Sequence, residues 1–335
     1  MPQTIAIYEF LANAAAMAES STDHQCWLIA DIGATSSRCA ILHMPGGDIS
    51  APRVYGNDAF SSLYELLADF LVTSGDTPRF CALAVAAPVL GNDVRMINRD
   101  WHFDTAKLGD ELGFEQVRIL NDFHAIAFAL PAFDDGSRIE IGQMKNQQSG
   151  NIAVLGPGSG LGMATWVGEK ENGVAMCGEG GHMTLAGRNV AETMIIEKLR
   201  ERYGHCSAER VLSGPGLMAL HRAMHGIDVA TSEEITSSSD DASCAATLQQ
   251  FFSFLGSVAA DLALITGAIG GVYIAGGIVP ACVEQLKASD FRSRFEDKNR
   301  YRGYMEAIPT YVITDPYPGL AGLAVFVAGR SIRGD

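Results

Sequence analysis

Short apolar runs that end at small residues recur along the chain. The run at residues 27–30 leads into a turn of small residues, and a second apolar run follows at 38–42. This pattern predicts a β-hairpin. The same succession of strand, small-residue tip and strand returns at residues 151–155 and 163–167. Because each hairpin opens a segment of about domain size, we predict two related α/β halves.

The rest of the chain alternates apolar runs with amphipathic stretches. Short runs that stop at Gly, Pro or Asn predict strands, and apolar residues at helical spacing predict helices. A stretch rich in Ser, Thr and acidic residues at 231–243 predicts an exposed loop. Asp104 is expected to cap one of the helices. The expected strands are 80–86, 117–120 and 271–275, and the expected helices are 60–71, 105–112, 123–130, 245–269 and 320–327, with a further helix after the turn at 276–280.

Composition narrows the classes of protein to consider. A length of 335 residues, 47% of them apolar, suits two domains with a large core. The formal charge of -15 argues against a nucleic-acid partner and against binding to an anionic membrane surface. A small anion such as ATP can still bind, because backbone N–H groups and a metal ion hold phosphate whatever the net charge.

The seven cysteines are widely spaced and include no C-x-x-C pair. This usage predicts a reduced, cytoplasmic protein without disulfides or structural zinc. The longest apolar stretches are broken well short of a membrane span. Residues 1–18 look helical and apolar, but they lack a basic start and contain Glu9, so a signal peptide is not expected. We treat residues 1–25 as an N-terminal extension.

Both hairpin tips are candidates for phosphate binding. Neither has the P-loop pattern or a dinucleotide fingerprint, since each lies between two strands. Small residues let backbone N–H groups approach phosphate oxygens, and Thr35 and Ser159 add hydroxyl donors. One tip alone is as readily an ordinary tight hairpin, but two tips favour phosphate binding. Asp31, near the end of the first strand, is placed to hold Mg²⁺ through water.

Asn121 and Asp122 stand where an expected strand ends and an expected helix begins. Asp at a helix start is a favoured N-cap, and on local sequence alone capping is the stronger interpretation of Asp122. The alternative is a base that accepts a hydroxyl proton. A helix N-terminus favours the charged carboxylate, which makes a weak base. Phosphoryl transfer tolerates a weak base because its transition state depends mainly on positioning and charge stabilisation.

Two acids and a histidine in Gly-rich segments are candidates for sugar binding. Glu179 and His182 are three residues apart in a turn, where Glu can accept hydrogen bonds from vicinal hydroxyls and His can donate or accept. A lone His is more often structural, and a lone Glu is usually solvated. Glu209 precedes a Ser-Gly-Pro-Gly turn that implies a fixed loop, although the plain alternative is an exposed helix acid.

Five motifs, in this order, resemble the bacterial glucokinase family, of the type first known from enteric bacteria. They are ILNDF at 119–123, GPGSGLG at 156–162, GEGGH at 178–182, SAERVLSGPG at 207–216 and GGVYIAGGIVP at 270–280. The resemblance covers nearly everything from Cys26 onward, and the combination is far more specific than any single motif.

The resemblance implies an actin/hexokinase-like (ribonuclease H-like) fold, in which two α/β domains enclose an interdomain cleft. Residues 26–132, completed by a C-terminal helix at 320–335, would form the smaller domain, and residues 133–319 the larger one. The resemblance also implies phosphorylation of glucose at O6 by ATP with Mg²⁺. The enzyme would be a glucokinase that is cytoplasmic and homodimeric.

Site residues carry over from the family by motif position, and Asp122 resembles the catalytic base. The residues that resemble sugar-binding groups are Asn121, Asp122, Glu179, His182 and Glu209. Those that resemble the ATP-binding segments are Ala30, Asp31, Ile32, Gly33, Ala34 and Thr35 of the first hairpin, Gly158, Ser159 and Gly160 of the second, and Gly276 and Gly277 on the adenosine side.

The first tip departs from the family pattern. The family usually reads Asp-[Ile/Val]-Gly-Gly-Thr-Asn where this chain has Asp-Ile-Gly-Ala-Thr-Ser at 31–36. If the backbone at Ala34 needs a positive φ, its methyl group costs roughly 1 kcal/mol, and we expect the tip to shift and ATP to bind less well. The chain also lacks the multi-cysteine zinc motif of the repressor/open-reading-frame sugar kinases, so no structural zinc is expected.

Two alternatives to a glucokinase stay open at this point. One is a kinase of the same fold that acts on another hexose, such as mannose or an amino sugar. The other is a catalytically inactive sugar sensor or transcriptional regulator. A sensor is expected to lose the base, whereas Asp122 is present. A regulator usually carries a DNA-binding helix-turn-helix, for which the N-terminal extension is too short and too acidic.

Overall fold

The computed structural model describes residues 25–44, 47–143, 148–170, 172–238 and 240–333. It divides into two compact units, the first formed by Met1–Ser137 with Asp315–Asp335 and the second by Arg138–Thr314. The expected N-terminal extension, residues 1–25, lies outside the described residues except for Gln25. The domain boundaries predicted from the sequence stay a prediction.

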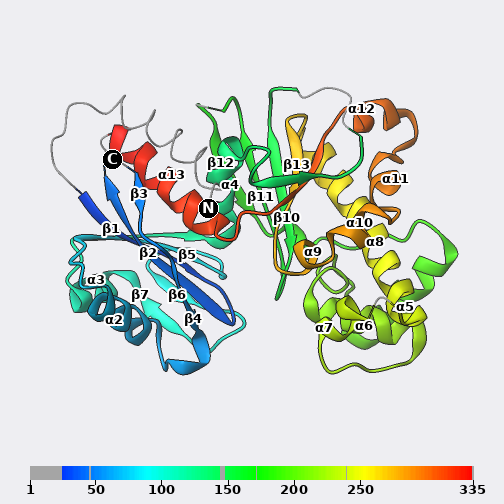
Figure 1. Ribbon diagram of the computed structural model, residues 1–335. Coiled ribbons are helices and arrows are strands. Elements are labelled where there is room, and N and C mark those ends of the chain that lie inside the picture. Colours follow the sequence, from blue (N-terminus) through cyan, green and yellow to red (C-terminus); the bar gives the residue numbers. More distant parts are fainter. Residues whose placement is uncertain (1–24, 45–46, 144–147, 171, 239, 334–335) are drawn as a thin grey trace. The chain divides into compact units, whose positions relative to one another are not determined.

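A mixed sheet forms the centre of the first unit (Figure 1). Its strands run in the order β3-β2-β1-β5-β8, with β4 paired to β2. The first hairpin pairs β1 with β2 in antiparallel fashion, and β5 and β8 then add in parallel. The strands are β1 (Gln25–Ile32), β2 (Ser36–Met44), β3 (Asp48–Ile49), β4 (Arg53–Gly56), β5 (Phe80–Val85) and β8 (Gln116–Asn121), and a separate pair consists of β6 (Asp93–Arg95) and β7 (His102–Asp104).

Helices cover both faces of this sheet because alternate residues of β1 point to opposite faces. Leu28, Ala30 and Ile32 join a core with α2 (Leu63–Ser74) and α3 (Thr105–Leu112). The opposite face packs against α13 (Pro318–Arg333), which also lies along α4 (Asp122–Ala129). Asp104 caps α3 as predicted, accepting hydrogen bonds from Ala106 and Lys107 N–H at 3.0 Å.

The contact between α13 and α4 is a backbone contact. A Cβ added at Gly322 of α13 would lie 1.8 Å from the carbonyl oxygen of Ala125 in α4. No larger residue fits there without separating the two helices. Short 3-10 turns extend the unit at Asn57–Ala59 and, after α4, at Leu130–Ala132.

The first five strands of the sheet in the second unit follow the same order as those of the first unit, and β9 adds at the edge. This sheet runs β12-β11-β10-β13-β14-β9, with β10 antiparallel to β11 and parallel to β13, and β13 parallel to β14. The prediction of two α/β halves that each begin with a hairpin is therefore confirmed. The strands are β9 (Arg138–Glu140), β10 (Ile152–Pro157), β11 (Leu161–Val167), β12 (Val174–Gly178), β13 (Gly271–Ile274) and β14 (Thr310–Ile313).

The core of the second unit is built around α8 (Ala242–Thr266), in which Phe251, Phe252, Phe254 and Leu255 are fully buried. The expectation that every apolar stretch stops well short of a membrane span is wrong for α8, which is long and apolar enough to cross one. However, 67% of its most apolar window is buried inside the unit, as in a core helix. The other helices are α5 (Val190–Tyr203), α6 (Gly214–His225), α7 (Ser232–Ser237), α9 (Ile278–Ala281), α10 (Val283–Lys287), α11 (Phe291–Glu296) and α12 (Arg302–Glu306), with 3-10 turns at Gly180–His182 and Asn299–Tyr301.

The loop expected at residues 231–243 is wrong, because α7 and the start of α8 occupy most of it. Thr231 and Glu234 form a capping box at the start of α7, in which each side chain binds the backbone of the other residue. Asp241 caps α8 through the N–H groups of Ser243 and Cys244. Ser, Thr and Asp in this stretch are helix caps, which composition alone does not distinguish from loop residues.

A buried ion pair joins three helices of the second unit. Glu192 of α5 is 1% exposed, and its carboxylate accepts hydrogen bonds from Arg294 of α11 (3.2 Å), the Arg188 N–H (2.8 Å) and Gln250 of α8 (3.4 Å). Burial raises the pKa of Glu192, but the hydrogen bonds from Arg294, Arg188 and Gln250, together with the charge of Arg294, outweigh it, so the net pKa is lowered. Removal of one partner leaves a buried charge uncompensated.

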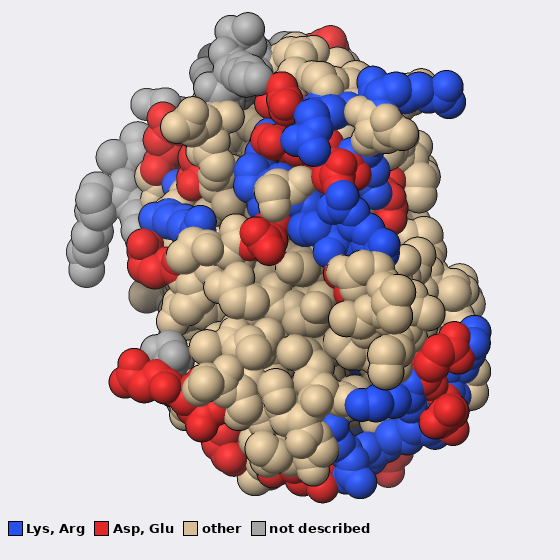
Figure 2. Space-filling view, turned by 90° about the vertical axis from the view of Figure 1, so that its right-hand side faces the viewer, with Lys and Arg blue, Asp and Glu red and all other residues tan. Residues whose placement is uncertain are grey.

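Charges of both signs are interspersed on the face of the molecule in Figure 2, with a broad uncharged area between the charged regions. Surface ion pairs of the second unit include Lys287 with Glu284 (2.8 Å) and Arg302 with Asp297 (3.2 Å). Exposed pairs of this kind add little stability, so the second unit depends mainly on its apolar core.

Acidification is expected to destabilise the second unit through His221, a 1% exposed residue whose Nδ1 lies 2.9 Å from Thr247 Oγ1. Burial, followed by the nearby His225, lowers the pKa of His221, while Asp241 acts in the opposite direction. The unfolded chain then binds the proton more readily, so this stabilisation is complete above about pH 6.5 and is lost as pH falls. We expect the loss to reach up to about 1.4 kcal/mol per pH unit, measured by denaturant unfolding between pH 7 and 5.

The variant His221→Gln should flatten this pH dependence, because Gln can bind Thr247 but does not titrate. His43→Gln, at an exposed position of the first unit, is the matched control and should keep the wild-type slope. Equal slopes for His221→Gln and the wild type would contradict the prediction.

Candidate active site

The carboxyl ends of three parallel strands bring the candidates of the first unit to one edge of its sheet. Ile32 at the end of β1 is level with Val85 of β5, and Val85 is level with Asn121 of β8. Two strand spacings, roughly 10 Å, therefore separate the first hairpin tip from Asn121 and Asp122. Ligands of open α/β sheets bind outside such carboxyl ends.

The first tip is held by a residue that sequence reasoning missed, Asn57. Its side-chain Nδ2 donates to the carbonyls of Gly33 (2.8 Å) and Ala34 (3.4 Å), and its backbone N–H donates to the carbonyl of Thr35 (2.9 Å). The Ser37 hydroxyl donates to Asn57 Oδ1 at 2.7 Å. Asn57 is completely buried.

The backbone of the tip carries no strain at Ala34. Among the described residues, the one non-glycine with φ in the left-handed region is Asn299, so Ala34 has an ordinary φ. The tip closes instead through a hydrogen bond from Gly33 N–H to the Ser36 carbonyl at 3.1 Å. The cost expected for the methyl group of Ala34 therefore does not arise.

Asp31 lies on the face of β1 that packs against α13, near the start of that helix. A Cβ added at Gly319 would lie 2.8 Å from its carboxyl carbon. Burial raises the pKa of Asp31, and Arg38, its partner across the hairpin, partly offsets this effect. The parts of the chain described contain no group of three or more His, Cys, Asp or Glu residues that could hold a metal. A single carboxylate beside a tip that is predicted to bind phosphate still fits Mg²⁺, which keeps several waters and takes other ligands from phosphates.

Asn121, not Asp122, is the N-cap of α4. Its Oδ1 accepts hydrogen bonds from the N–H groups of Phe123 (3.0 Å) and His124 (3.2 Å), and its Nδ2 donates to the carbonyl of Ala87 after β5 (3.3 Å). The expected cap at Asp122 is thus wrong by one residue. Asp122 is the first residue of α4, half-buried, and its Oδ1 accepts from Phe123 N–H at 2.9 Å.

In the second unit, Glu209 connects the second hairpin tip to the turn at Gly180–His182. Glu209 Oε2 accepts a hydrogen bond from Leu161 N–H at 2.8 Å, and its own N–H donates to the Gly181 carbonyl at 2.9 Å. The Ser213 hydroxyl donates to the Glu209 carbonyl at 2.9 Å. This half-buried residue lies in the turn before α6, so the alternative of an exposed helix acid is wrong. The fixed loop expected at Ser-Gly-Pro-Gly is also wrong, because Ser213 is the N-cap of α6 and Gly214 begins the helix.

Glu179 and His182 flank this turn and are both exposed. The His182 N–H donates to the Glu179 carbonyl at 3.1 Å, so the two residues are fixed relative to each other. A Cβ added at Gly181 would lie 2.2 Å from the Leu161 carbonyl. This glycine is therefore required for the turn to lie directly against the second hairpin.

Gly158–Gly160 and Gly276–Gly277 are also brought together within the second unit. The Gly158 N–H donates to the Gly160 carbonyl at 2.8 Å, which closes the tip. Gly276 follows β13 with φ 87°, and a Cβ there would lie 2.2 Å from the Pro157 carbonyl. Each unit thus collects its own set of candidate residues.

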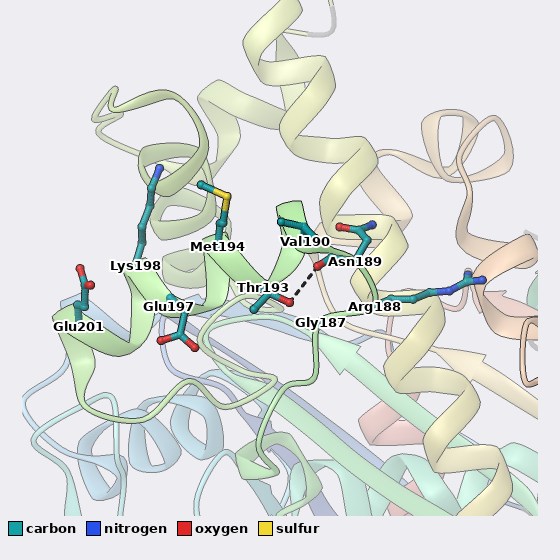
Figure 3. A pocket seen from close by; sticks show the side chains of 9 residues that line it. All are labelled: Gly187, Arg188, Asn189, Val190, Thr193, Met194, Glu197, Lys198 and Glu201. Carbon is teal, nitrogen blue, oxygen red and sulfur yellow. Dashed lines mark hydrogen bonds between the residues drawn. The ribbon is translucent and has the colours of Figure 1, made fainter.

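A pocket of about 560 Å³ in the second unit contains none of the predicted site residues (Figure 3). It is lined by the loop before α5 and by one side of that helix, where Thr193 Oγ1 donates to the Asn189 carbonyl at 2.9 Å. The lining residues are Gly187, Arg188, Asn189, Val190, Thr193, Met194, Glu197, Lys198 and Glu201.

Two sheets of the same strand order, each opened by a small-residue hairpin, define an enzyme of the actin-like ATPase fold. Residues 28–330 match the family model described as glucokinase. The chain is 44% identical over 308 residues to the glucokinase of Aromatoleum aromaticum, which covers 89% of this chain and 93% of that protein. It is 39% identical over 303 residues to the glucokinase of Salmonella typhi, and the aligned part covers 88% of this chain and 94% of that protein.

Solved structures agree with this match. The crystal structure of a glucokinase from an Antarctic psychrotroph has a TM-score of 0.77 at 33% identity, covering 91% of this chain and 99% of that one. A ROK family glucokinase from Streptomyces griseus, solved in complex with glucose and AMPPNP, shares the fold at 16% identity (TM-score 0.55, covering 90% and 98%). The chain belongs to the glucokinase family. Its activity is the ATP-dependent phosphorylation of glucose, as its motifs predicted.

The close contact at Gly276 can be tested by substitution. We expect Gly276→Ala to destabilise the second unit by more than about 1 kcal/mol, because φ is positive and the Pro157 carbonyl occupies the Cβ position. Thermal unfolding followed by circular dichroism measures this loss. Gly303→Ala is the control, since nothing lies within 4 Å of its added Cβ. Equal melting temperatures for both variants would contradict the prediction.

Proposed function

We propose that this glucokinase transfers the γ-phosphoryl group of ATP to O6 of glucose, with Asp122 as the base. The observation that carries the proposal is the capping of α4 by Asn121. The Asn121 amide is the N-cap of α4, so Asp122 is not the cap but the first residue of the helix, where its Oδ1 also accepts from Phe123 N–H. It stands at the same sheet edge as the first hairpin tip.

Asp122 accepts the proton of the O6 hydroxyl as the bond from oxygen to phosphorus forms. A helix N-terminus favours a charged carboxylate, and a weak base suffices for a loose transition state. The ADP oxygen leaves as its bond to the γ-phosphorus breaks. Asn121, whose amide is held by Ala87 and by the start of α4, orients the sugar beside the base.

The remaining sugar hydroxyls are assigned to the second unit. Glu179 and His182 are exposed and fixed relative to each other, so they can bind neighbouring hydroxyls. Glu209 uses Oε2 to hold Leu161 N–H, and a carboxylate oxygen has further acceptor capacity for a sugar hydroxyl. Sugar binding would therefore involve a residue that also supports the second tip.

The ATP phosphates are assigned to the two tips, and the adenosine to Gly276 and Gly277. The first tip contributes the segment from Ala30 through Ile32 to Thr35, and the second contributes Gly158–Gly160 with the Ser159 hydroxyl. When bound, Mg²⁺ neutralises phosphate charge, and Asp31 would hold it through water. A cytoplasmic location and a homodimer complete the proposal. The location rests on the family resemblance and the cysteine usage, and the homodimer rests on the family resemblance.

The base assignment predicts that Asp122→Asn lowers kcat by about 100-fold or more, within the range for loss of a general base. Glucose affinity should change little, because the amide keeps the shape of the side chain. A coupled assay of ADP formation measures the turnover of the wild type and of Asp122→Asn. The sugars tested are glucose, mannose, fructose, glucosamine and N-acetylglucosamine, and the wild type should prefer glucose.

Asp110→Asn, at an exposed position on α3, is the control and should keep wild-type turnover. Strong residual activity of Asp122→Asn at saturating substrates would exclude Asp122 as the base. No turnover of any sugar by the wild type would overturn the proposed reaction.

The sugar-binding assignment predicts that Glu179→Gln raises KM for glucose by about tenfold or more and leaves KM for ATP nearly unchanged. Hydrogen bonds to a charged group contribute about 1.5–3 kcal/mol, and Gln provides a weaker acceptor. Steady-state kinetics with each substrate varied in turn separates the two constants. Glu201→Gln, exposed on α5, is the control, and an unchanged KM for glucose in Glu179→Gln would count against the assignment.

A further inference from the structure

Three consecutive carbonyls of the first tip are bound by one residue. The Asn57 side chain takes the carbonyls of Gly33 and Ala34, and its backbone N–H takes that of Thr35. Asn57 lies more than 20 positions further along the chain, at the start of the 3-10 turn Asn57–Ala59. The conformation of the tip is thus set from outside the hairpin.

The orientation of the Asn57 amide is determined by its surroundings. Its Oδ1 faces the Ser37 hydroxyl at 2.7 Å, and its Nδ2 faces two carbonyl oxygens. Nδ2 must be the donor because carbonyls only accept. Complete burial leaves no water to replace these bonds, so loss of the amide would leave buried polar groups unpaired.

Arg99 supports the same arrangement from the side of Asn57. Its guanidinium donates to the Asn57 carbonyl and, at 3.5 Å, to the Ala34 carbonyl. It is held over the Trp101 ring, 4.5 Å from the centroid, and paired with Asp58 at 2.9 Å. A fixed positive charge therefore lies beside the carbonyl ends of the tip.

The N–H groups of the tip are left for a ligand. Within the described chain, the N–H groups of Ala34 and Thr35 have no hydrogen-bond acceptor. Backbone carbonyls repel phosphate oxygens, whereas successive N–H groups attract them. Because Asn57 binds the three carbonyls, these groups point away from the ligand. The N–H groups of the tip stay available to phosphate oxygens.

We propose that Asn57 is a positioning residue that orients the first tip for the phosphates of ATP. The inference rests on the proposed function in one respect, namely that residues 33–35 bind phosphate. Asn57 does not touch the nucleotide itself. Its effect is transmitted through the carbonyls of Gly33, Ala34 and Thr35.

The test uses Asn57→Asp in the full-length chain. Asp has nearly the same shape, but a carboxylate cannot donate to the Gly33 and Ala34 carbonyls and repels them. We expect KM for ATP to rise about tenfold, corresponding to the net contribution of about one hydrogen bond, while KM for glucose stays within about twofold. If Asn57 had only a structural role, the variant would change KM for ATP and KM for glucose together, or it would change the melting temperature and neither KM.

Two controls separate the possible failures. Asn92→Ala, an exposed Asn of the same unit, should match the wild type in both KM values. Ala34→Pro removes an N–H that the proposal gives to phosphate and should raise KM for ATP. If Ala34→Pro leaves KM for ATP unchanged, the phosphate role of the tip fails, and the inference about Asn57 fails with it.

If Ala34→Pro raises KM for ATP and Asn57→Asp does not, only the inference about Asn57 is overturned. Circular dichroism establishes whether each variant is folded. Where Asn57→Asp does not fold, Asn57→Ser replaces it, since the short hydroxyl cannot reach both carbonyls and carries no charge. A folded Asn57→Ser with unchanged KM for ATP would equally overturn the inference.

Discussion

Parallel pairing of β1 with β5 and of β5 with β8 is the constraint on which the candidate site residues of the first unit depend. It places the carboxyl ends of all three strands level with one another, so Ile32 and Asn121 come to the same edge. A shift of register by one residue would move every side chain of a strand to the opposite face. Asp31 would then leave the side of α13, and the bond from Asn121 to Ala87 would be lost.

The C-terminal helix α13 packs on one face of the three parallel strands and stabilises their pairing. α13 contacts β1, β5 and α4, and its Gly322 lies against the Ala125 carbonyl of α4. The helix that carries Asp122 is therefore packed against a segment almost 200 residues away in sequence. In the second unit the corresponding support comes from Glu209, which binds the backbone of both the second tip and the neighbouring turn.

Elements with strong apolar periodicity were predictable from sequence, and contacts between distant residues were not. The two hairpins and the cap at Asp104 follow from local pattern. The segment containing α7 was misassigned because the capping residues Thr231 and Glu234 have the composition of a loop. The cap at Asn121 was placed one residue late, since Asn and Asp are nearly equal as N-caps. Asn57 gave no signal, because a Gly-Asn-Asp segment is typical of a surface turn, whereas here the Asn is buried.

The support given by Asn57 also bears on how the family motif is interpreted in divergent members. A loop whose conformation depends only on its own residues tolerates few substitutions. The loss of a glycine from such a loop then indicates that its conformation has changed. Here an outside scaffold holds the carbonyls of Gly33, Ala34 and Thr35, and Ala34 has an ordinary φ. We therefore expect the tip to keep its conformation when a residue of the motif is substituted, provided that Asn57 still binds its carbonyls. A substitution within such a loop is then poor evidence that function has been lost.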